Sequence, residues 1–276
     1  MNATQRETYW LKVERLRRTI EDKYGPILKS ILNAEVKRIA KVCSEIGPTA
    51  ALSFLGTVAW DDKMAAALRE LYKEAGLVFG NASYRASSVM SKKSDDPNGI
   101  NDELARKMAE FLLMFGLQLS AFITETTKKR ISFLILSGQK IGLDGRGIAD
   151  NINNDIEIGL TLNRSKRIAR TETMRASNYA AYIAAQEHPY FVDKIWISTR
   201  DARTRRIPKN YYDHWDMDGQ MSKLEEPFVS RDVGGRVVMA QFPGDPRTPK
   251  GFSIGCRCTV GFIPRRDSDG NLVMKR

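Results

Sequence analysis

Apolar side chains recur at helical spacing along the first 45 residues of the chain. Gly25-Pro26 interrupts the pattern, and Gly47-Pro48 ends it, because proline removes a hydrogen-bond donor and clashes with the preceding turn. Two helices are therefore predicted. Their apolar faces are Tyr9, Val13, Leu16, Ile20 and Tyr24, then Leu28, Leu32, Val36, Ile39 and Cys43. Most charged residues of the first helix are expected off this face, namely Arg6, Glu14, Arg17, Arg18 and Glu21.

Helical spacing continues over about residues 50–75, with Gly76 as the predicted stop and Asp61 as an N-cap if the helix breaks and restarts near Trp60. Residues 91–101 are polar and turn-rich, which predicts an exposed, protease-sensitive loop. A long helix capped by Asn101 or Asp102 is then expected to run to about residue 130, with residues 131–136 as an extension.

A glycine-rich loop follows at residues 137–147, but it lacks the Gly-Lys-Ser/Thr ending of a phosphate-binding loop. Two more helices are predicted over residues 148–158, ended by Gly159, and 163–187. Beyond Pro189 branched and aromatic residues become frequent, which predicts strands over residues 191–198, 236–242 and 259–263. The predicted fold class is α+β: a long, mainly helical N-terminal region, residues 1–145, followed by a small helix-plus-β-hairpin module, residues 146–276.

The composition is that of an ordinary folded protein, with 42% hydrophobic and 28% charged residues among 276. No apolar run approaches the ~20 residues of a membrane span. The N-terminus has no apolar signal segment, so we expect a cytoplasmic protein with no membrane partner. The net charge of +11 favours polyanions such as DNA, or serves only solubility. Residues 194–276 hold 16 basic and 10 acidic residues, a net +6, and are the more basic part per residue.

His214, Cys256 and Cys258 have the side chains that zinc prefers, although a structural site usually has four ligands. A fourth would come from Asp201, Asp213, Asp216, Asp218 or water. The alternative is a pair of reduced, packed cysteines with His214 bonded to a turn. A thiol nucleophile with a histidine base is a further interpretation, which the sequence context does not favour. Cys43 is expected in the core.

Other polar residues cluster in the last third of the chain. Arg170 and Asn178 share one side of a helix, and Glu172 lies within reach of Arg175. Such residues either form a polar site or hold irregular loops through charge-assisted hydrogen bonds. The same two interpretations, with an anion as the ligand, apply to Asp201, Arg203 and Arg205. An exposed contact patch is predicted for Tyr211, Tyr212 and Trp215.

The order of these polar residues resembles the phage head-morphogenesis family that includes the phage Mu F protein. The resemblance covers roughly residues 146–263 and departs from the family at residues 207–213, which lengthen one loop. The sequence features that match the family pattern are Arg170-Thr171-Glu172, Asn178, Lys194-Ile195-Trp196, Asp201-Ala202-Arg203-Thr204-Arg205, His214 with Gly219, and Cys256-Arg257-Cys258.

The resemblance implies a minor capsid protein of a tailed double-stranded-DNA phage or prophage, found in the virion at the portal vertex or capsid interior. Its expected partners are the portal protein, a major capsid or scaffolding protein, and DNA through weak non-specific contact. Helices over residues 5–24 and 101–130 would supply docking surface. The resemblance implies no catalysis and no cofactor beyond the zinc considered above. The rival hypothesis is a metal- or thiol-dependent hydrolase or nuclease that uses His214, Cys256 and Cys258.

Overall fold

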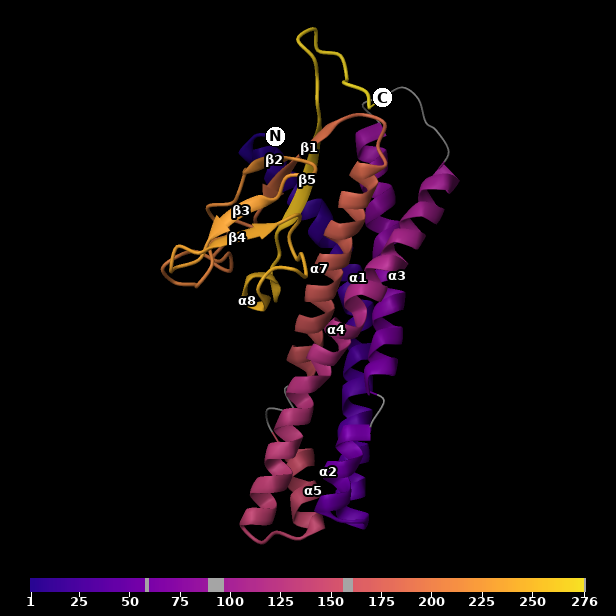
Figure 1. Ribbon diagram of the computed structural model, residues 1–276, viewed down its shortest axis with the longest axis vertical. Coiled ribbons are helices and arrows are strands. Elements are labelled where there is room, and N and C mark those ends of the chain that lie inside the picture. The colour runs from indigo at the N-terminus through magenta and orange to yellow at the C-terminus, as the bar shows by residue number, and fades with distance from the viewer. Residues whose placement is uncertain (58–59, 89–96, 156–160, 276) are drawn as a thin grey trace. The chain divides into compact units, whose positions relative to one another are not determined.

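The computed structural model describes residues 1–57, 60–88, 97–155 and 161–275. The long helices are α1 (Ala3–Glu45), α3 (Trp60–Ser88), α4 (Pro97–Lys140) and α7 (Thr161–Gln186), and the shorter ones are α2 (Pro48–Thr57), α5 (Gly145–Asn154) and α8 (Lys250–Ser253). Strands β1 (Val192–Ile197), β2 (Met221–Lys223), β3 (Phe228–Arg231), β4 (Val237–Ala240) and β5 (Thr259–Pro264) follow α7 (Figure 1). The predicted α+β class, helices first and small sheets last, is confirmed.

Helix α1 is continuous, so the prediction that Gly25-Pro26 separates two helices is wrong. A proline inside a helix costs about 3 kcal/mol. Burial of Ile20 and Tyr24 before it, and of Leu28 and Leu32 after it, outweighs this cost, since each large apolar side chain contributes about 1.5–3 kcal/mol. The predicted end at Gly47-Pro48 is confirmed, because α1 stops at Glu45 and α2 begins at Pro48.

Helix α3 passes through Gly76, which was predicted to end it. A Cβ atom on Gly76 would lie 2.7 Å from Met108 Cγ, and one on Gly80 would lie 2.5 Å from Leu104 Cδ1. These two glycines therefore let α4 approach α3 closely. Helix α3 begins at Trp60, so Asp61, which was predicted as an N-cap, lies inside the helix. Residues 58–59, where a break would fall, lie outside the described part of the chain, and the break stays a prediction.

Helix α4 begins at Pro97, four or more residues before the predicted cap at Asn101 or Asp102. It ends at Lys140, about ten residues beyond the predicted end near residue 130. The expected loop at 137–147 is correspondingly short, because Asp144 caps α5 by accepting a hydrogen bond from Gly147 N at 2.8 Å. Most of the predicted protease-sensitive loop and the predicted helix end at Gly159 lie outside the described residues.

The chain forms two compact units, each made of separate stretches of sequence. One comprises residues 21–70 and 112–169, and its core is a cluster of buried side chains that includes Leu28, Leu32, Ile39, Cys43, Met64, Leu68, Ile131, Ile135, Ile148 and Ile152. The other comprises residues 1–20, 71–111 and 170–276. The division at residue 145 stays a prediction about domains, because these units describe packing only.

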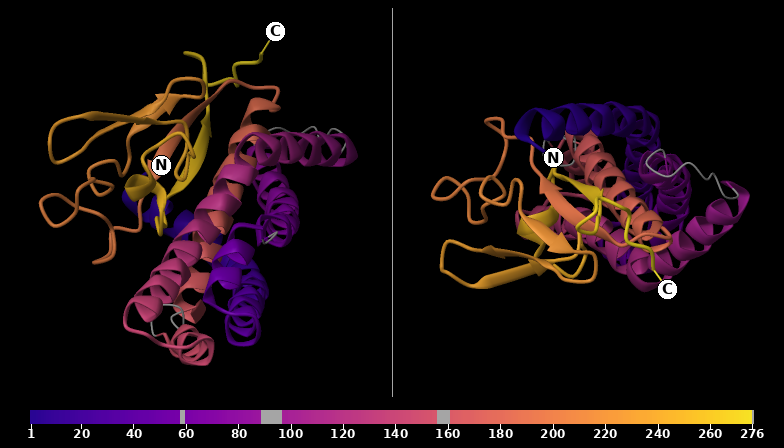
Figure 2. Two further views of the ribbon diagram at one scale, coloured as in Figure 1. Left: turned by 60° about the horizontal axis from the view of Figure 1, so that its bottom comes forward. Right: turned by 90° about the horizontal axis from the view of Figure 1, so that it is seen from above.

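The unit with residues 170–276 contains both sheets. In the first, β1 is central and pairs antiparallel with β2 and with β5, so that Lys194 lies opposite Phe262 and Trp196 opposite Val260. The second is a hairpin of β3 with β4. Beyond residue 170, α7 lies beside β1 and β5 (Figure 2), and Ala185 on α7 packs with Val192 on β1.

The three predicted strands are confirmed as β1, β4 and β5, whereas β2 and β3 were missed. They have three and four residues, too few to show alternation clearly. None of the helices, over the described residues, has the length and hydropathy that crossing a membrane would require.

Candidate functional site

Arg17 on α1 is the centre of a buried polar cluster in the unit that holds the strands. Its side chain is 1% exposed. The guanidinium donates hydrogen bonds to Ser177 Oγ at 2.7 Å, Asn178 Oδ1 at 2.9 Å and the carbonyl of Cys258 at 3.2 Å. One side chain thus joins α1, α7 and the start of β5, and it satisfies acceptors that would be costly to bury alone.

Asn178 uses both ends of its carboxamide in the same cluster. Besides Arg17, Oδ1 accepts from Thr259 Oγ1 at 3.1 Å and from Val260 N at 3.2 Å. Nδ2 donates to the carbonyls of Pro243 at 2.9 Å and Cys258 at 3.2 Å. The motif asparagine therefore fixes β5 and the loop after β4 against α7.

Glu172 and Arg175, one helical turn apart on α7, form a buried ion pair with two contacts of 2.7 and 2.6 Å. Tyr72 on α3 donates to Glu172 at 2.8 Å, and Arg175 Nε donates to the carbonyl of Gly244 at 2.8 Å. Burial, and then the Glu172 carboxylate, raise the pKa of Tyr72 well above its usual value. The pair links α3, α7 and the loop after β4. Arg170, two residues earlier, is half-buried.

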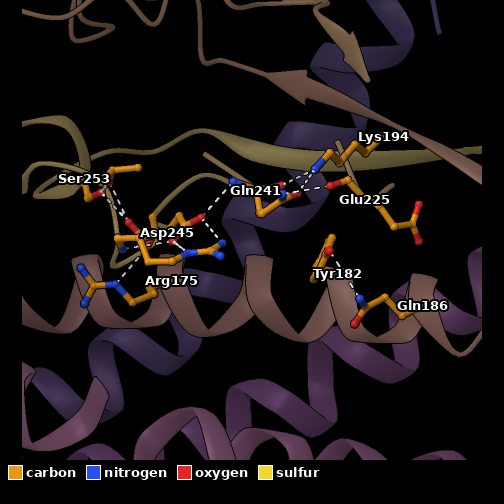
Figure 3. A network of polar contacts seen from close by, with 11 residues as sticks. Arg175, Tyr182, Gln186, Lys194, Glu225, Gln241, Asp245 and Ser253 are labelled. Carbon is orange, nitrogen blue, oxygen red and sulfur yellow. Dashed lines mark hydrogen bonds and ion pairs between the residues drawn. The ribbon is translucent and has the colours of Figure 1, made fainter. Parts of the chain in front are cut away.

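Lys194 on β1 is buried beside this loop (Figure 3). Its ammonium donates to the carbonyl of Gln241 at 3.0 Å and to Gln241 Oε1 at 2.5 Å, and it lies 4.9 Å from the ring centroid of Phe228 and 5.5 Å from that of Tyr182. Burial lowers the pKa of Lys194 to about 8, against the opposing effect of Glu225.

Asp245 organises the part of the network in Figure 3 that lies on the loop after β4. It accepts from the backbone N–H groups of Gln241 at 2.9 Å and Arg247 at 3.0 Å, and from Arg247 Nε at 2.8 Å. The Asp245 carboxylate is buried, so each of these bonds holds the loop in one conformation.

His214, Cys256 and Cys258 converge, although 42 residues separate the histidine from the first cysteine. Nδ1 of His214 lies 3.4 Å from Cys256 Sγ and 3.6 Å from Cys258 Sγ, and the three ligand atoms lie within 4.8 Å of one another. All three side chains are buried, and both cysteines are free thiols. Phe252 and Trp196 pack on the histidine ring at centroid distances of 4.4 and 5.7 Å.

The two thiols of this cluster are not equivalent. Burial raises the pKa of Cys256, but hydrogen bonding to Cys258 and the charge of His214 outweigh it and bring that pKa well below the usual value. Burial, followed by the neighbouring Cys256, raises the pKa of Cys258. The cluster therefore holds two cysteine sulfurs and an imidazole nitrogen, the donor types that zinc binds.

No carboxylate joins this group within the described part of the chain. Three of the four aspartates considered as a fourth ligand are used elsewhere: Asp201 pairs with Arg203, Asp213 accepts from Ile207 N at 3.2 Å and from Asp216 N at 2.8 Å, and Asp218 accepts from Ser198 N at 2.9 Å. Nε2 of His214 is buried without a hydrogen-bond partner among the described residues. Three side chains whose donor atoms suit zinc thus lie together.

The loop after β1 is held by the motif residues themselves. Asp201 accepts from the backbone N–H of Arg203 at 2.8 Å and pairs with its guanidinium, and Arg205 donates to the carbonyl of Ile254. Arg257 lies 3.8 Å from Glu14 on α1. Gly219 donates its N–H to the carbonyl of Trp196 at 2.8 Å and has a φ of 86°, which favours glycine.

The three aromatic residues predicted as a contact patch differ in exposure. Tyr211 is 45% exposed, whereas Tyr212 and Trp215 are half-buried. Tyr212 packs on Phe252 at a centroid distance of 5.5 Å, and Trp215 lies under two arginines. Only Tyr211 thus presents a large aromatic surface to solvent.

Sequence reasoning missed Arg17, Trp10 and Tyr72 as members of the site. Trp10 donates its indole N–H to the carbonyl of Arg257 at 2.9 Å. Arg17 was expected off the apolar face, and so were Glu14 and Glu21, yet all three are buried. The available signal was spacing, since Arg17 lies four residues after Val13 and three before Ile20, on the apolar face itself.

Comparison with protein-family models matches residues 129–261 to the model described as "Phage Mu protein F like protein". This segment runs from the second half of α4 into β5 and includes the motif residues of α7, β1, the loops and the Cys-Arg-Cys sequence. Searches of curated proteins and of solved structures found no match.

Proposed function

We propose that this chain, which belongs through residues 129–261 to the phage Mu protein F-like family of phage head-morphogenesis proteins, is a minor capsid protein that binds the portal during procapsid assembly. The family is one of structural head proteins and is not known for enzymatic activity. In this proposal the protein is incorporated into the procapsid and stays in the virion, where a major capsid or scaffolding protein is a further partner.

The observation that carries the proposal is that the motif side chains bind the protein's own backbone. The polar groups of Asn178, Arg175 and Arg205 bind backbone carbonyls of other segments. Such bonds satisfy buried backbone groups and make a loop-rich module rigid. A rigid module whose motif side chains are turned inward suits a binding and assembly role. The rival hydrolase or nuclease gains no support here, since His214 is 1% exposed and Cys256 and Cys258 are each 3% exposed.

The portal contact is best assigned to α4. The other helix expected to dock, over residues 5–24, exposes the single large apolar side chain of Leu11, at 55%, and buries Trp10, Val13 and Ile20. On α4, by contrast, Leu113 is 79% exposed and Met114 is 62% exposed. Adjacent exposed apolar side chains of this size are typical of protein-binding surfaces.

Mass spectrometry of gradient-purified procapsids and virions, with a portal pull-down, tests the proposal. The wild-type chain is expected in both particles and bound to portal. The Leu113→Ser/Met114→Ser variant is expected to lose portal binding, whereas Glu125→Ser/Thr126→Ser, at two exposed positions of the same helix, is expected to keep it. Absence of the wild-type chain from particles and from portal complexes would overturn the proposal.

The three-ligand cluster supports a second, structural element of the proposal. Two cysteine sulfurs and His214 Nδ1 are suited to hold a zinc ion, which would supply cross-linking between β5 and the loop before β2. A small core of this kind benefits from such a link. The residues fit the donor preference of zinc, and water would complete the four ligands.

A further inference from the structure

A basic groove lies on the loop between β1 and β2, outside the buried cluster. It has a volume of about 530 Å³, and its lining includes Arg200, Asp201, Arg206, Pro208, Lys209 and Trp215. In Figure 2 this loop is part of the orange segment that leads from β1. The segment 207–213, which lengthens the loop relative to the family pattern, supplies Ile207, Pro208 and Lys209 to the groove.

The groove is built on a well-bonded backbone. Arg205 O accepts from the N–H groups of His214 at 2.9 Å and Trp215 at 3.0 Å, and Asn210 N donates to Arg206 O at 2.9 Å. The Asn210 side chain makes a second hydrogen bond to the same residue, in which Oδ1 accepts from Arg206 N at 3.1 Å. These bonds hold the two ends of the inserted segment together.

Trp215 organises the cations. The guanidinium carbons of Arg200 and Arg206 each lie 5.1 Å from the centroid of the Trp215 ring, within the range of a cation–π contact. Arg200 also has a φ of 51°, which is uncommon for a residue other than glycine. Strained backbone of this kind persists where the surrounding structure imposes it, and it clusters at functional positions.

Positive charge exceeds negative charge in the groove. Arg200, Arg206 and Lys209 are exposed, and the carboxylate of Asp201 is paired with Arg203. Asp218 lies 3.5 Å from Arg200, but it is already bonded to Arg6 at 2.9 Å. Arg200 and Arg206 therefore keep guanidinium N–H groups available while each lies over the tryptophan ring.

We propose that this groove binds the sugar-phosphate backbone of DNA without reading its sequence. Planar guanidinium groups and an exposed ammonium match phosphate oxygens, and such contacts carry affinity but no base specificity. Trp215 is half-buried under the arginines, so it serves as their support rather than as a platform for bases. The inference rests on the proposed head function for the identity of the polyanion, which is the DNA packaged in the head.

Salt-dependent binding of the full chain to a fluorescent 30-base-pair duplex tests this inference. The variant Arg200→Gln/Arg206→Gln/Lys209→Gln lowers the net charge from +11 to +8. It is expected to weaken binding at 50 mM salt at least about tenfold, and to reduce the slope of log K against log salt by roughly 2–3, since each phosphate contact contributes about 0.9.

A matched control is present in the other compact unit. Lys37, Lys41 and Arg146 line a second open groove, of about 620 Å³, whose described lining residues include no aromatic side chain. Replacing these three by glutamine removes the same charge, and the salt slope is expected to stay within about one unit of the wild type. Equal loss of slope in both variants would mean that net charge alone binds DNA, and it would overturn the inference.

A charge-preserving variant tests the role of the tryptophan. Arg200→Lys/Arg206→Lys keeps the charge but removes the planar groups that lie over Trp215, so binding is expected to weaken several-fold. Wild-type affinity in this variant would contradict the proposed arrangement. All variants are checked for native circular dichroism and elution volume.

The test of DNA binding by the groove can fail without affecting the proposed head function. The triple glutamine variant is expected to enter procapsids like the wild type, because the groove is distinct from the exposed residues on α4. If the wild-type protein is found in particles and on the portal but binds no duplex, the groove inference fails and the proposed function stands.

Discussion

Arg17 Nη2 donates a hydrogen bond of 2.9 Å to Asn178 Oδ1, and this contact joins residues 161 positions apart. Asn178 belongs to the family-like motif, whereas Arg17 lies on the first helix, outside the matched segment. The motif asparagine is thus held by a residue that the family segment does not contain. The first five turns of α1 are accordingly part of the compact unit that contains residues 170–276.

Arg17→Met is expected to destabilise the protein by about 3 kcal/mol. The substitution removes the hydrogen-bond donor to three buried acceptors, on Ser177, Asn178 and the carbonyl of Cys258. Each buried acceptor left unsatisfied costs about 1–3 kcal/mol. Urea unfolding measures the change. Arg18→Met is the control, because Arg18 is exposed and surface changes usually stay within about 0.5 kcal/mol. Similar losses in both variants would contradict the assigned role of Arg17.

The Glu172–Arg175 ion pair on α7 is expected to contribute more to the free energy of unfolding than the hydrogen bond from Tyr72. Glu172→Gln leaves the buried guanidinium of Arg175 without its counterion, which costs about 3–5 kcal/mol. Tyr72→Phe removes only one hydrogen bond to the carboxylate, worth about 1.5–3 kcal/mol. Denaturation curves of the two variants give the order. A larger loss for Tyr72→Phe would show that Glu172 and Arg175 are not the main link.

Lys194 is expected to make stability depend on pH in the alkaline range. Burial lowers its pKa from 10.5 to about 8 in the folded protein. Between these values the unfolded chain binds more protons than the folded one, so this group makes the free energy of unfolding rise with pH from about 8 to 10.5. Below pH 8 the lysine is charged in both states and carries its burial penalty.

The measurement compares the wild type with Lys194→Met across that pH window. Glu225, Glu226, Asp245 and Arg247 surround Lys194 in both proteins, so their contributions largely cancel in the difference. The stability of the wild type relative to the variant is expected to increase as the pH rises. A constant difference from pH 7 to 10.5 would show that Lys194 keeps its ordinary pKa.

Zinc content tests the cysteine and histidine cluster. Protein purified without chelators is expected to carry about one zinc ion per chain by elemental analysis, and a chelator is expected to lower the melting temperature. Cys256→Ser/Cys258→Ser should lose the metal. Cys43→Ser should retain it, because Cys43 is a buried thiol of the other unit. A chain without zinc, with a melting temperature unaffected by the chelator, would leave the three side chains as a packed hydrogen-bonded cluster.

Local pattern was sufficient for much of the fold. The strands β1 and β5 and the helix α7 follow from branched-residue runs and a long helical period, and both are properties of neighbouring residues. The Glu172–Arg175 contact also follows from helical spacing alone. The polar motif on these elements was sufficient to indicate the family.

Other features depended on contacts between distant segments. Whether α1 continues through Pro26, and whether α3 continues through Gly76, is decided by what packs on either side of these residues. Helix-breaking residues raise the local free energy, but burial against other helices exceeds that cost, and the partners are not adjacent in sequence. The short strands β2 and β3 are likewise defined by pairing rather than by pattern.

The sequence by itself determined which side chains with metal-binding, ion-pairing and phosphate-binding chemistry the chain carries, because residue type sets the chemistry. Only the tertiary structure decided that His214 meets both cysteines, that Arg17 is buried against Asn178, and that two arginines share the ring of Trp215. The physical reason is that burial and proximity are set by the packing of the whole chain, and free-energy terms that depend on distance cannot be read from spacing along it.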